Sequence, residues 1–180
     1  MRSARPPIWG IVAEFESAHE LLAAARRVRD AGYRRIDAYT PFPVEGLDHA
    51  LGLRPTWLSA LVLAGGLTGA SGGFFMQWYA MAVWYPLNVG GRPLNSWPMF
   101  IPITFELAVL VAGLTAAFGM LALNGLPLPY HPLFNVPRFA RATQDRFFLA
   151  VLAIDPRFDR RATAELLHAL GATEVSEVAH

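Results

Sequence analysis

Two long uncharged stretches dominate the hydropathy pattern of the chain. Residues 57–85 contain no charged residue, residues 99–123 contain only Glu106, and a connector rich in proline, glycine and asparagine separates them. A membrane-spanning helix needs roughly 20 mostly apolar residues, because about 30 Å of hydrocarbon is crossed at about 1.5 Å per residue. A helix also satisfies its backbone polar groups internally, as lipid requires. The pattern therefore predicts a transmembrane hairpin over residues 57–123, rather than buried helices of a soluble core.

The segment before the hairpin has first a strand pattern and then a helix pattern. Residues 8–15 (IWGIVAEF) are a short run of branched and aromatic residues, which is typical of a strand. Ser17 and Glu20 have the spacing of a capping box, and apolar residues then recur at helical spacing until Gly32, a residue suited to end a helix. Residues 35–40 (RIDAYT) predict a second, more polar strand.

The segment after the hairpin repeats this order. Residues 147–154 (FFLAVLAI) predict an apolar strand, and Asp159 is a candidate N-cap for a helix that Gly171 ends. Residues 173–178 (TEVSEV) predict a last polar strand. A strand-helix-strand unit therefore occurs twice, once on each side of the hairpin.

Two such units make the β-α-β-β-α-β order of a ferredoxin-like sandwich, in which the first and third strands are central. Neither flank is long enough to bury a sufficient core alone. We therefore expect residues 1–56 and 124–180 each to supply half of one domain plus an irregular loop, with the hairpin of residues 57–123 inserted between them. Two unrelated flanking peptides held by partner proteins are the alternative.

The composition excludes several classes of function. The formal net charge is +1, the 15 basic residues are all arginine, and they form no block of the kind that binds nucleic acid. Cysteine is absent, which excludes disulfides, thiolate ligation of iron-sulfur clusters, covalently attached haem and a cysteine nucleophile.

The placement of arginine predicts the orientation of the hairpin. Arg54, Arg138 and Arg141 lie near its ends in the sequence, whereas the connector holds only Arg92. The start of the chain has no cleavable signal-peptide pattern. We therefore expect a multi-pass protein of the bacterial cytoplasmic membrane with both termini in the cytoplasm. An outer aromatic belt is then expected near the connector, formed by Trp78, Tyr79, Trp84, Tyr85 and Trp97.

Glu106 and Gln77 are a candidate polar pair inside the hairpin. Charged groups at membrane depth usually face protein or water, and they are therefore candidates for function. Gln77 lies nine residues before Pro86 and Glu106 lies nine residues after Trp97, so we expect both side chains at the same level. Three roles stay open for Glu106: a hydrogen bond with Gln77, contact with a polar group of a neighbouring subunit, or a role in a proton path or quinol site.

Gly65, Gly69 and Gly73 form a stripe of small residues at four-residue spacing. Such a stripe lets two helix backbones approach closely. It is expected to pack either on the second helix of the hairpin, through Gly113 and Ala117, or on another subunit.

No pattern indicates a catalytic or metal site. The histidines have no ligand pair at i, i+3 or i, i+4 spacing, and His49 with His131 is only a weak candidate metal pair. There is neither a nucleophile elbow nor a phosphate-binding glycine loop. We expect no catalytic residue, metal ligand or cofactor in this chain.

Three segments carry a resemblance to a known family: DAYTPFPVEGLDHALGLRPT at residues 37–56, YPLNVGGRPLNSWPMFIPITFEL at 85–107 and HPLFNVPRFARATQDRFFLAV at 131–151. With them the chain resembles the ActD-type subunit of bacterial alternative complex III, a respiratory or photosynthetic membrane assembly that oxidises quinol. The resemblance implies an accessory subunit with two transmembrane helices, a cytoplasmic domain and no cofactor of its own. It implies as partners quinol-binding membrane subunits, an iron-sulfur subunit and cytochrome subunits, which hold the haem and the clusters.

The loops of residues 41–55 and 127–137 are rich in proline and look too irregular for helices or strands. We expect them to pack against neighbouring subunits. A membrane-anchored sensor or regulatory module is the alternative function, because the ferredoxin-like fold alone does not determine function.

Overall fold

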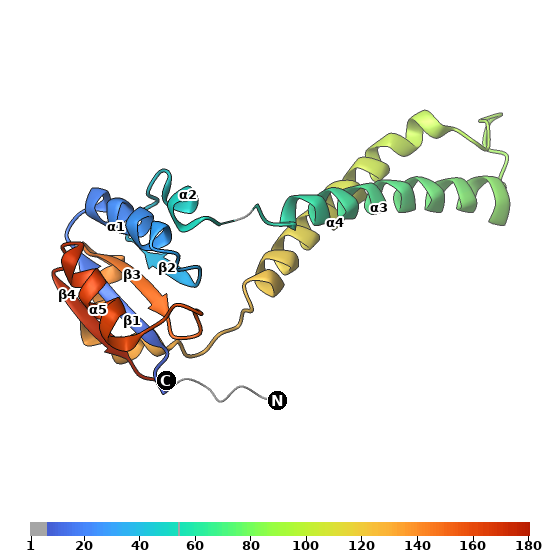
Figure 1. Cartoon of the computed structure of the whole chain (residues 1–180). Coiled ribbons are helices and arrows are strands. Elements are labelled where there is room, and N and C mark those ends of the chain that lie inside the picture. The colour runs from blue at the N-terminus through green and yellow to red at the C-terminus, as the bar shows by residue number, and fades with distance from the viewer. Residues whose placement is uncertain (1–6, 54) are drawn as a thin grey trace. The chain divides into compact units, whose positions relative to one another are not determined.

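The computed structural model describes residues 7–53 and 55–180, so Arg54, used above for the orientation, lies outside the described residues. The chain divides into two compact units. One joins the segment before residue 55 to residues 129–180, and the other comprises Pro55–Leu128 (Figure 1).

The first unit contains an antiparallel sheet of four strands in the order β2-β3-β1-β4. The strands are β1 (Gly10–Phe15), β2 (Ile36–Tyr39), β3 (Phe147–Leu152) and β4 (Glu174–Val178). The central pair joins the two flanks of the hairpin, from Gly10 opposite Leu152 to Phe15 opposite Phe147. The predicted central position of the first and third strands is confirmed, although each strand is shorter than predicted.

Two helices, α1 (Ala18–Asp30) and α5 (Arg160–Ala169), pack on one face of this sheet. Their caps are those predicted: Ser17 accepts a hydrogen bond from the amide of Glu20, and Asp159 accepts from the amides of Arg161 and Ala162. The Glu20 carboxylate, however, reaches the amide of Glu16 rather than that of Ser17.

The apolar core between the helices and the sheet comes from both flanks of the hairpin. Its fully buried members are Ile11, Ala13, Phe15, Leu21, Ala25, Val28, Leu149, Val151 and Leu167.

The opposite face of the sheet is covered by two short 3-10 helices, η3 (Pro132–Asn135) and η4 (Pro137–Thr143). Successive strand residues point to opposite faces, so Val12 and Phe148 form a second apolar surface that must be shielded from water. Leu133 and Phe139 pack against it. The prediction that residues 127–137 are irregular was therefore wrong for η3, whose Leu133 is buried in the chain itself.

The loop of residues 41–55 is also more regular than predicted. It contains the short helix α2 (Leu47–Leu51), whose Ala50 and Leu51 are buried in the same core as α1. The guanidinium of Arg29 on α1 donates to the carbonyl of Leu51. Part of this loop therefore completes the sheet unit.

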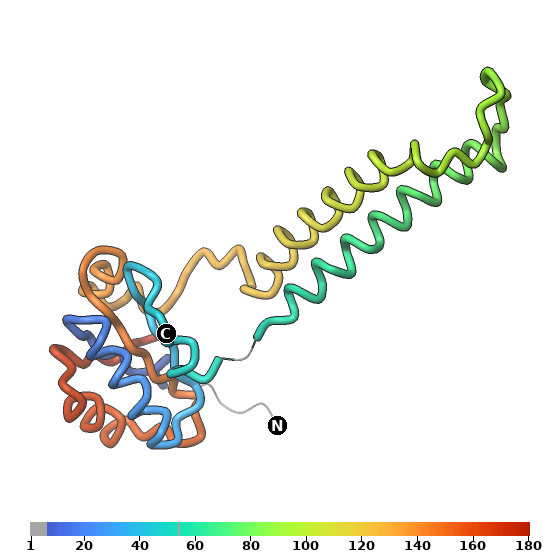
Figure 2. Tube along the Cα trace, turned by 90° about the horizontal axis from the view of Figure 1, so that it is seen from above, coloured from blue at the N-terminus to red at the C-terminus, as the bar shows by residue number. Residues whose placement is uncertain are grey.

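The second unit is a pair of long helices. α3 (Leu58–Trp78) continues as the π-helix η1 (Tyr79–Trp84), and the 3-10 helix η2 (Trp97–Phe100) leads into α4 (Ile101–Leu123). Each continuous run is 27 residues long and apolar enough to cross a membrane. The two helices lie side by side (Figure 2). They leave most of their apolar side chains exposed.

Candidate interaction surfaces

The stripe of Gly65, Gly69 and Gly73 lies at the contact between α3 and α4. A Cβ atom at Gly69 would overlap the carbonyl oxygen of Leu107, and one at Gly65 would overlap the Thr115 hydroxyl. The two helix backbones approach this closely only because the glycines carry no side chain.

The prediction that Gly113 and Ala117 lie opposite this stripe was wrong. No atom lies within 4 Å of a Cβ built at Gly113, and Ala117 is exposed. Thr104, Leu107, Val111 and Thr115 face the glycines instead. The spacing of small residues could not predict which side of α4 turns toward α3.

Gln77 ties the last turns of α3 to the start of α4. Its side chain is 7% exposed. Its Nε2 lies 3.1 Å from the carbonyl oxygen of Gly73, 3.1 Å from that of Phe100 and 3.5 Å from the Thr104 hydroxyl. The amide is thus satisfied by the hairpin itself.

The predicted hydrogen bond between Glu106 and Gln77 is not formed. Thr104 is the residue of α4 that reaches Gln77. Glu106 follows two residues later, which turns its side chain by about 200° around the helix. It is exposed, and no hydrogen-bond or ion-pair partner is found for it within residues 7–53 and 55–180.

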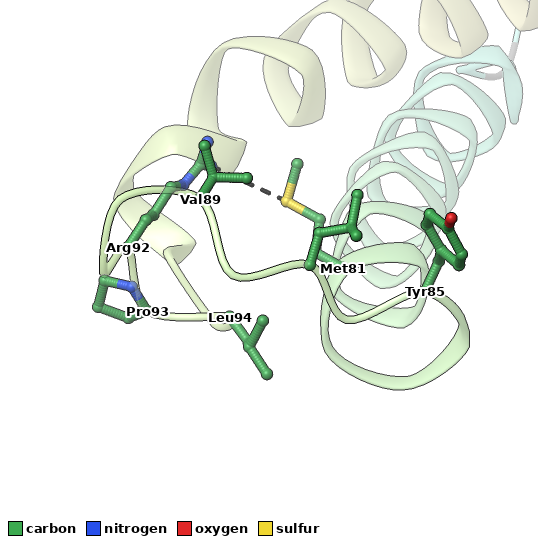
Figure 3. A pocket seen from close by; sticks show the side chains of 7 residues that line it. Met81, Tyr85, Val89, Arg92, Pro93 and Leu94 are labelled. Carbon is green, nitrogen blue, oxygen red and sulfur yellow. Dashed lines mark hydrogen bonds between the residues drawn. The ribbon is translucent and has the colours of Figure 1, made fainter.

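A small apolar cavity lies between η1 and the connector (Figure 3). Its volume is 160 Å3, and it is lined by Met81, Tyr85, Leu87, Val89, Arg92, Pro93 and Leu94. The Arg92 guanidinium donates to the Ser96 hydroxyl at 2.9 Å and lies 3.8 Å from the Met81 sulfur. The only charged group of the connector is therefore used to close the loop.

The aromatic residues near the connector are largely exposed. The exposed fraction is 75% for Trp84, 69% for Tyr85 and 55% for Trp97. Rings with a polar edge on an apolar helix end suit the boundary between hydrocarbon and headgroups.

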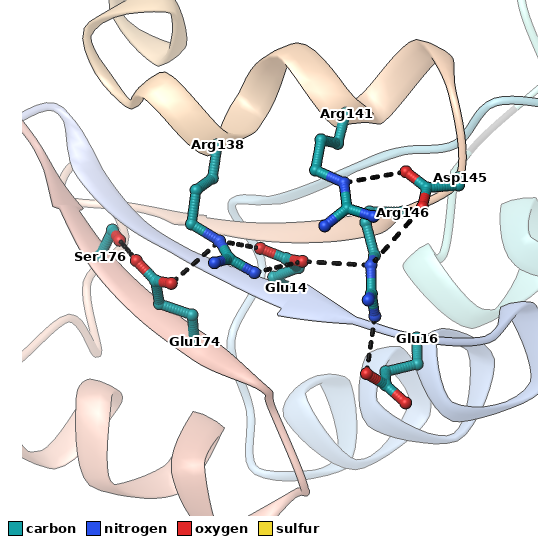
Figure 4. A network of polar contacts seen from close by, with 8 residues as sticks. All are labelled: Glu14, Glu16, Arg138, Arg141, Asp145, Arg146, Glu174 and Ser176. Carbon is teal, nitrogen blue, oxygen red and sulfur yellow. Dashed lines mark hydrogen bonds and ion pairs between the residues drawn. The ribbon is translucent and has the colours of Figure 1, made fainter.

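In the sheet unit, a network of ion pairs crosses the second face of the sheet (Figure 4). Glu14 on β1 is 2% exposed and lies between Arg138 of η4 and Arg146. Its hydrogen bond with Arg138 lowers the pKa of Glu14, helped by the positive charges of Arg146 and Arg141 and opposed by burial. The network fastens η4 to the sheet.

A groove of 520 Å3 runs beside the edge strand β2. Its walls include Tyr39, His131, Phe134 and Phe139. Burial, together with the neighbouring Asp37 carboxylate, raises the pKa of Tyr39. His131 packs edge-on against Trp9 and Tyr39, and its Nδ1 accepts from the amide of Leu133 at 3.3 Å.

These contacts give His131 a structural role in the start of η3 and offer nothing in favour of the weak metal pair with His49. Within the residues that the structure describes, no three histidine or acidic side chains gather so that they could hold a metal ion.

A comparison with models of protein families identifies the family of this chain. The model of a family described as alternative complex III, ActD subunit, matches residues 9–177. None of the curated proteins matches the chain. The matched range covers both the sheet unit and the helical hairpin.

Proposed function

The chain belongs to the ActD subunit family of alternative complex III, and from this premise we propose that it is an accessory subunit of a quinol-oxidising membrane complex. In this proposal it holds no cofactor and catalyses no step. Haem and iron-sulfur clusters belong to partner subunits. The observation that carries the proposal is the family match across both units, residues 9–177.

The hairpin is proposed to cross the bacterial cytoplasmic membrane twice. In support, each helical run has 27 residues, about 40 Å at 1.5 Å per residue, which exceeds the hydrocarbon thickness of about 30 Å. The exposed side chains of α3 and α4 are apolar apart from those of Ser59, Thr68, Ser71 and Glu106, which suits a surface that faces lipid or other membrane subunits.

The sheet unit is proposed to be a ferredoxin-like domain on the cytoplasmic side. The strand order β2-β3-β1-β4, with all neighbours antiparallel and two helices on one face, supports this fold. The two chain segments that connect the units then leave and enter the domain on the same side of the membrane. The role proposed for the domain is to bind cytoplasmic parts of the complex and to stabilise its assembly.

Affinity purification of the tagged chain from native membranes in mild detergent tests the proposal. We expect a stoichiometric assembly that contains haem and oxidises quinol. A chain that purifies alone, or only with copies of itself, would overturn the proposed function.

The topology can be tested separately, because the chain contains no cysteine. Single cysteines at Val89 in the connector and at His19 on α1 would be labelled by a membrane-impermeant maleimide in intact cells. Labelling at Val89 and protection at His19 are expected. The reverse pattern, or labelling at both positions, would contradict cytoplasmic termini.

The groove beside β2 favours one other function, a membrane-anchored sensor that binds a small ligand. An apolar cleft with a few polar groups is the usual form of a ligand site. A sensor would purify without haem, so the same purification separates the two functions.

A further inference from the structure

Glu106 lies on a face of α4 that the chain itself leaves uncovered. The level of Glu106 in the hairpin follows from its neighbours: a Cβ at Gly73 would meet Thr104 and Leu107, so Glu106 is level with Gly73. It is the tenth residue of the 27-residue run Trp97–Leu123. If the hairpin crosses the membrane as proposed, the carboxyl group is about 14 Å from the end of that run.

Among residues 7–53 and 55–180, no group pairs with Glu106 at that depth. Arg92 is the only other charged residue in residues 57–123, and it lies in the connector. Gln77, the nearest amide, already donates within the hairpin. A second copy of the chain brings the same side chains and so offers no cation at this level.

We propose that the Glu106 face of α4 docks against a transmembrane helix of another subunit, which places a basic side chain opposite the carboxylate. This inference rests on the proposed function. Charged groups within a membrane pair with one another or face a wet cavity, and the exposed neighbours of Glu106 on α4 are apolar. A carboxylate that is surrounded by apolar side chains and lacks a partner in its own chain is best stabilised by a positive charge from a different chain.

The rest of this face suits a close helix contact. Gly113 and Ala117 lie seven and eleven residues after Glu106, on the same side of α4 at 3.6 residues per turn. Gly113 has open space where a Cβ would be, and Ala117 is exposed. A partner helix can therefore approach the backbone of α4 below the carboxylate.

The test is retention of the tagged chain in the complex after purification in mild detergent. Two substitutions, Glu106→Leu and Glu106→Gln, are compared with the wild type and with Phe105→Leu. Phe105 is 67% exposed at nearly the same depth and serves as the matched control. Neither change at Glu106 removes a contact within the hairpin, so the helix pair should form in every variant.

The proposal expects both Glu106→Leu and Glu106→Gln to be largely lost from the complex and Phe105→Leu to be retained. Retention of Glu106→Gln together with loss of Glu106→Leu would mean that the partner group is a neutral donor, which overturns the basic partner. Full retention of Glu106→Leu would overturn docking on this face.

A second variant keeps the charge but moves it. Glu106→Leu combined with Phe105→Glu turns the carboxylate by about 100° around α4 at nearly constant depth. We expect this variant to be lost from the complex as well, because the basic side chain of the partner subunit lies only on the side of α4 that carries residue 106. Retention would mean that a carboxylate anywhere at this depth suffices and would contradict a specific pair.

Failure of the docking inference and failure of the proposed function give different results. If the wild-type chain itself does not purify with a haem-containing complex, the proposed function fails and the docking inference falls with it. If the wild type is retained and Glu106→Leu is retained equally, only the docking inference fails.

Discussion

The Glu14 carboxylate accepts two hydrogen bonds from the Arg138 guanidinium, at 2.7 and 2.9 Å, across 124 positions of sequence. This pair joins the central strand β1 to η4, which lies after the hairpin. It therefore links the two halves of the sheet unit on the face that α1 and α5 do not cover. A carboxylate whose pKa is lower in the folded than in the unfolded state stabilises the fold while it is ionised.

Replacement of Glu14 with glutamine is expected to lower the unfolding temperature at neutral pH and to lower it less at acidic pH. The folded-state pKa of Glu14 lies below its ordinary value of 4.5. Its contribution is therefore complete above that pH and disappears as the pH falls through the folded-state pKa. Thermal unfolding of the detergent-solubilised chain, followed by circular dichroism at several pH values, should show the unfolding temperatures of the wild type and Glu14→Gln approaching each other as the pH falls.

Glu16→Gln is the matched control for this prediction. Glu16 is 61% exposed and pairs with Arg146, another member of the network. Exposed ion pairs contribute about 0–1 kcal/mol, so its removal should change the unfolding temperature little. A difference between wild type and Glu14→Gln that stays constant from neutral to acid pH would show that the charge of Glu14 is not the cause.

The hydrogen bond between Tyr33 and Thr163 gives a second prediction. Their hydroxyl oxygens are 3.0 Å apart and join the turn after α1 to α5 inside the core. Thr163→Val leaves the Tyr33 hydroxyl buried without a partner and should lower the free energy of unfolding by about 1–3 kcal/mol.

A double-mutant cycle tests the cause of this loss. The combined change Tyr33→Phe and Thr163→Val removes both polar groups and should be less destabilising than the sum of the single changes. Denaturant unfolding of the four proteins measures the coupling. Strictly additive losses would mean that the two hydroxyls do not stabilise each other.

The long helices and the individual strands could be predicted because they depend on patterns within one segment. A run without charge over more than 20 residues predicts a long apolar helix wherever it packs. The repeated strand-helix-strand units predict two apolar central strands, since the first and third runs are the most apolar. These features can be predicted without knowing which other segment of the chain packs against them.

The side-chain contacts could not be predicted, because they depend on rotation and on distant segments. Glu106 was expected at the level of Gln77, but it is level with Gly73, one turn away. Its side chain also lies on the other side of α4 from Thr104, the residue that reaches Gln77. The partner of Glu14, Arg138, lies just after the predicted irregular loop of residues 127–137, in a segment for which no helix or strand was predicted. The one available signal was the acid itself, since a carboxylate within an apolar central strand requires a positive partner.

Leu133 and Phe134 provide a third prediction, on whether residues 132–143 belong to the fold. Leu133 in η3 is 0% exposed, whereas its neighbour Phe134 is 71% exposed. Leu133→Ala should lower the free energy of unfolding by about 2–5 kcal/mol, because it leaves a cavity against the sheet. Phe134→Ala, the adjacent control, should change it by less than about 0.5 kcal/mol. Equal losses would mean that η3 does not cover the sheet in solution.

Gly69 and Gly72 lie three residues apart on α3, but only Gly69 faces α4, and they give the last prediction. A Cβ at Gly69 would overlap the backbone of Leu107, whereas no atom lies within 4 Å of one at Gly72. Gly69→Leu should therefore force α3 and α4 apart, and Gly72→Leu should leave their spacing unchanged. Both changes add the same apolar side chain to the same helix, so any general effect of leucine is matched.

Spin labels on cysteines introduced at Ser59 and Leu121 would report the spacing of the two helices in detergent micelles. Both positions are exposed, and they lie at the same end of the pair, where Gly119 approaches Leu58. Pulsed electron spin resonance should give a longer and broader distance distribution for Gly69→Leu than for the wild type and Gly72→Leu. If both variants keep the wild-type distribution, the glycine stripe is not what holds α3 against α4, and its role would have to be sought in contact with another subunit.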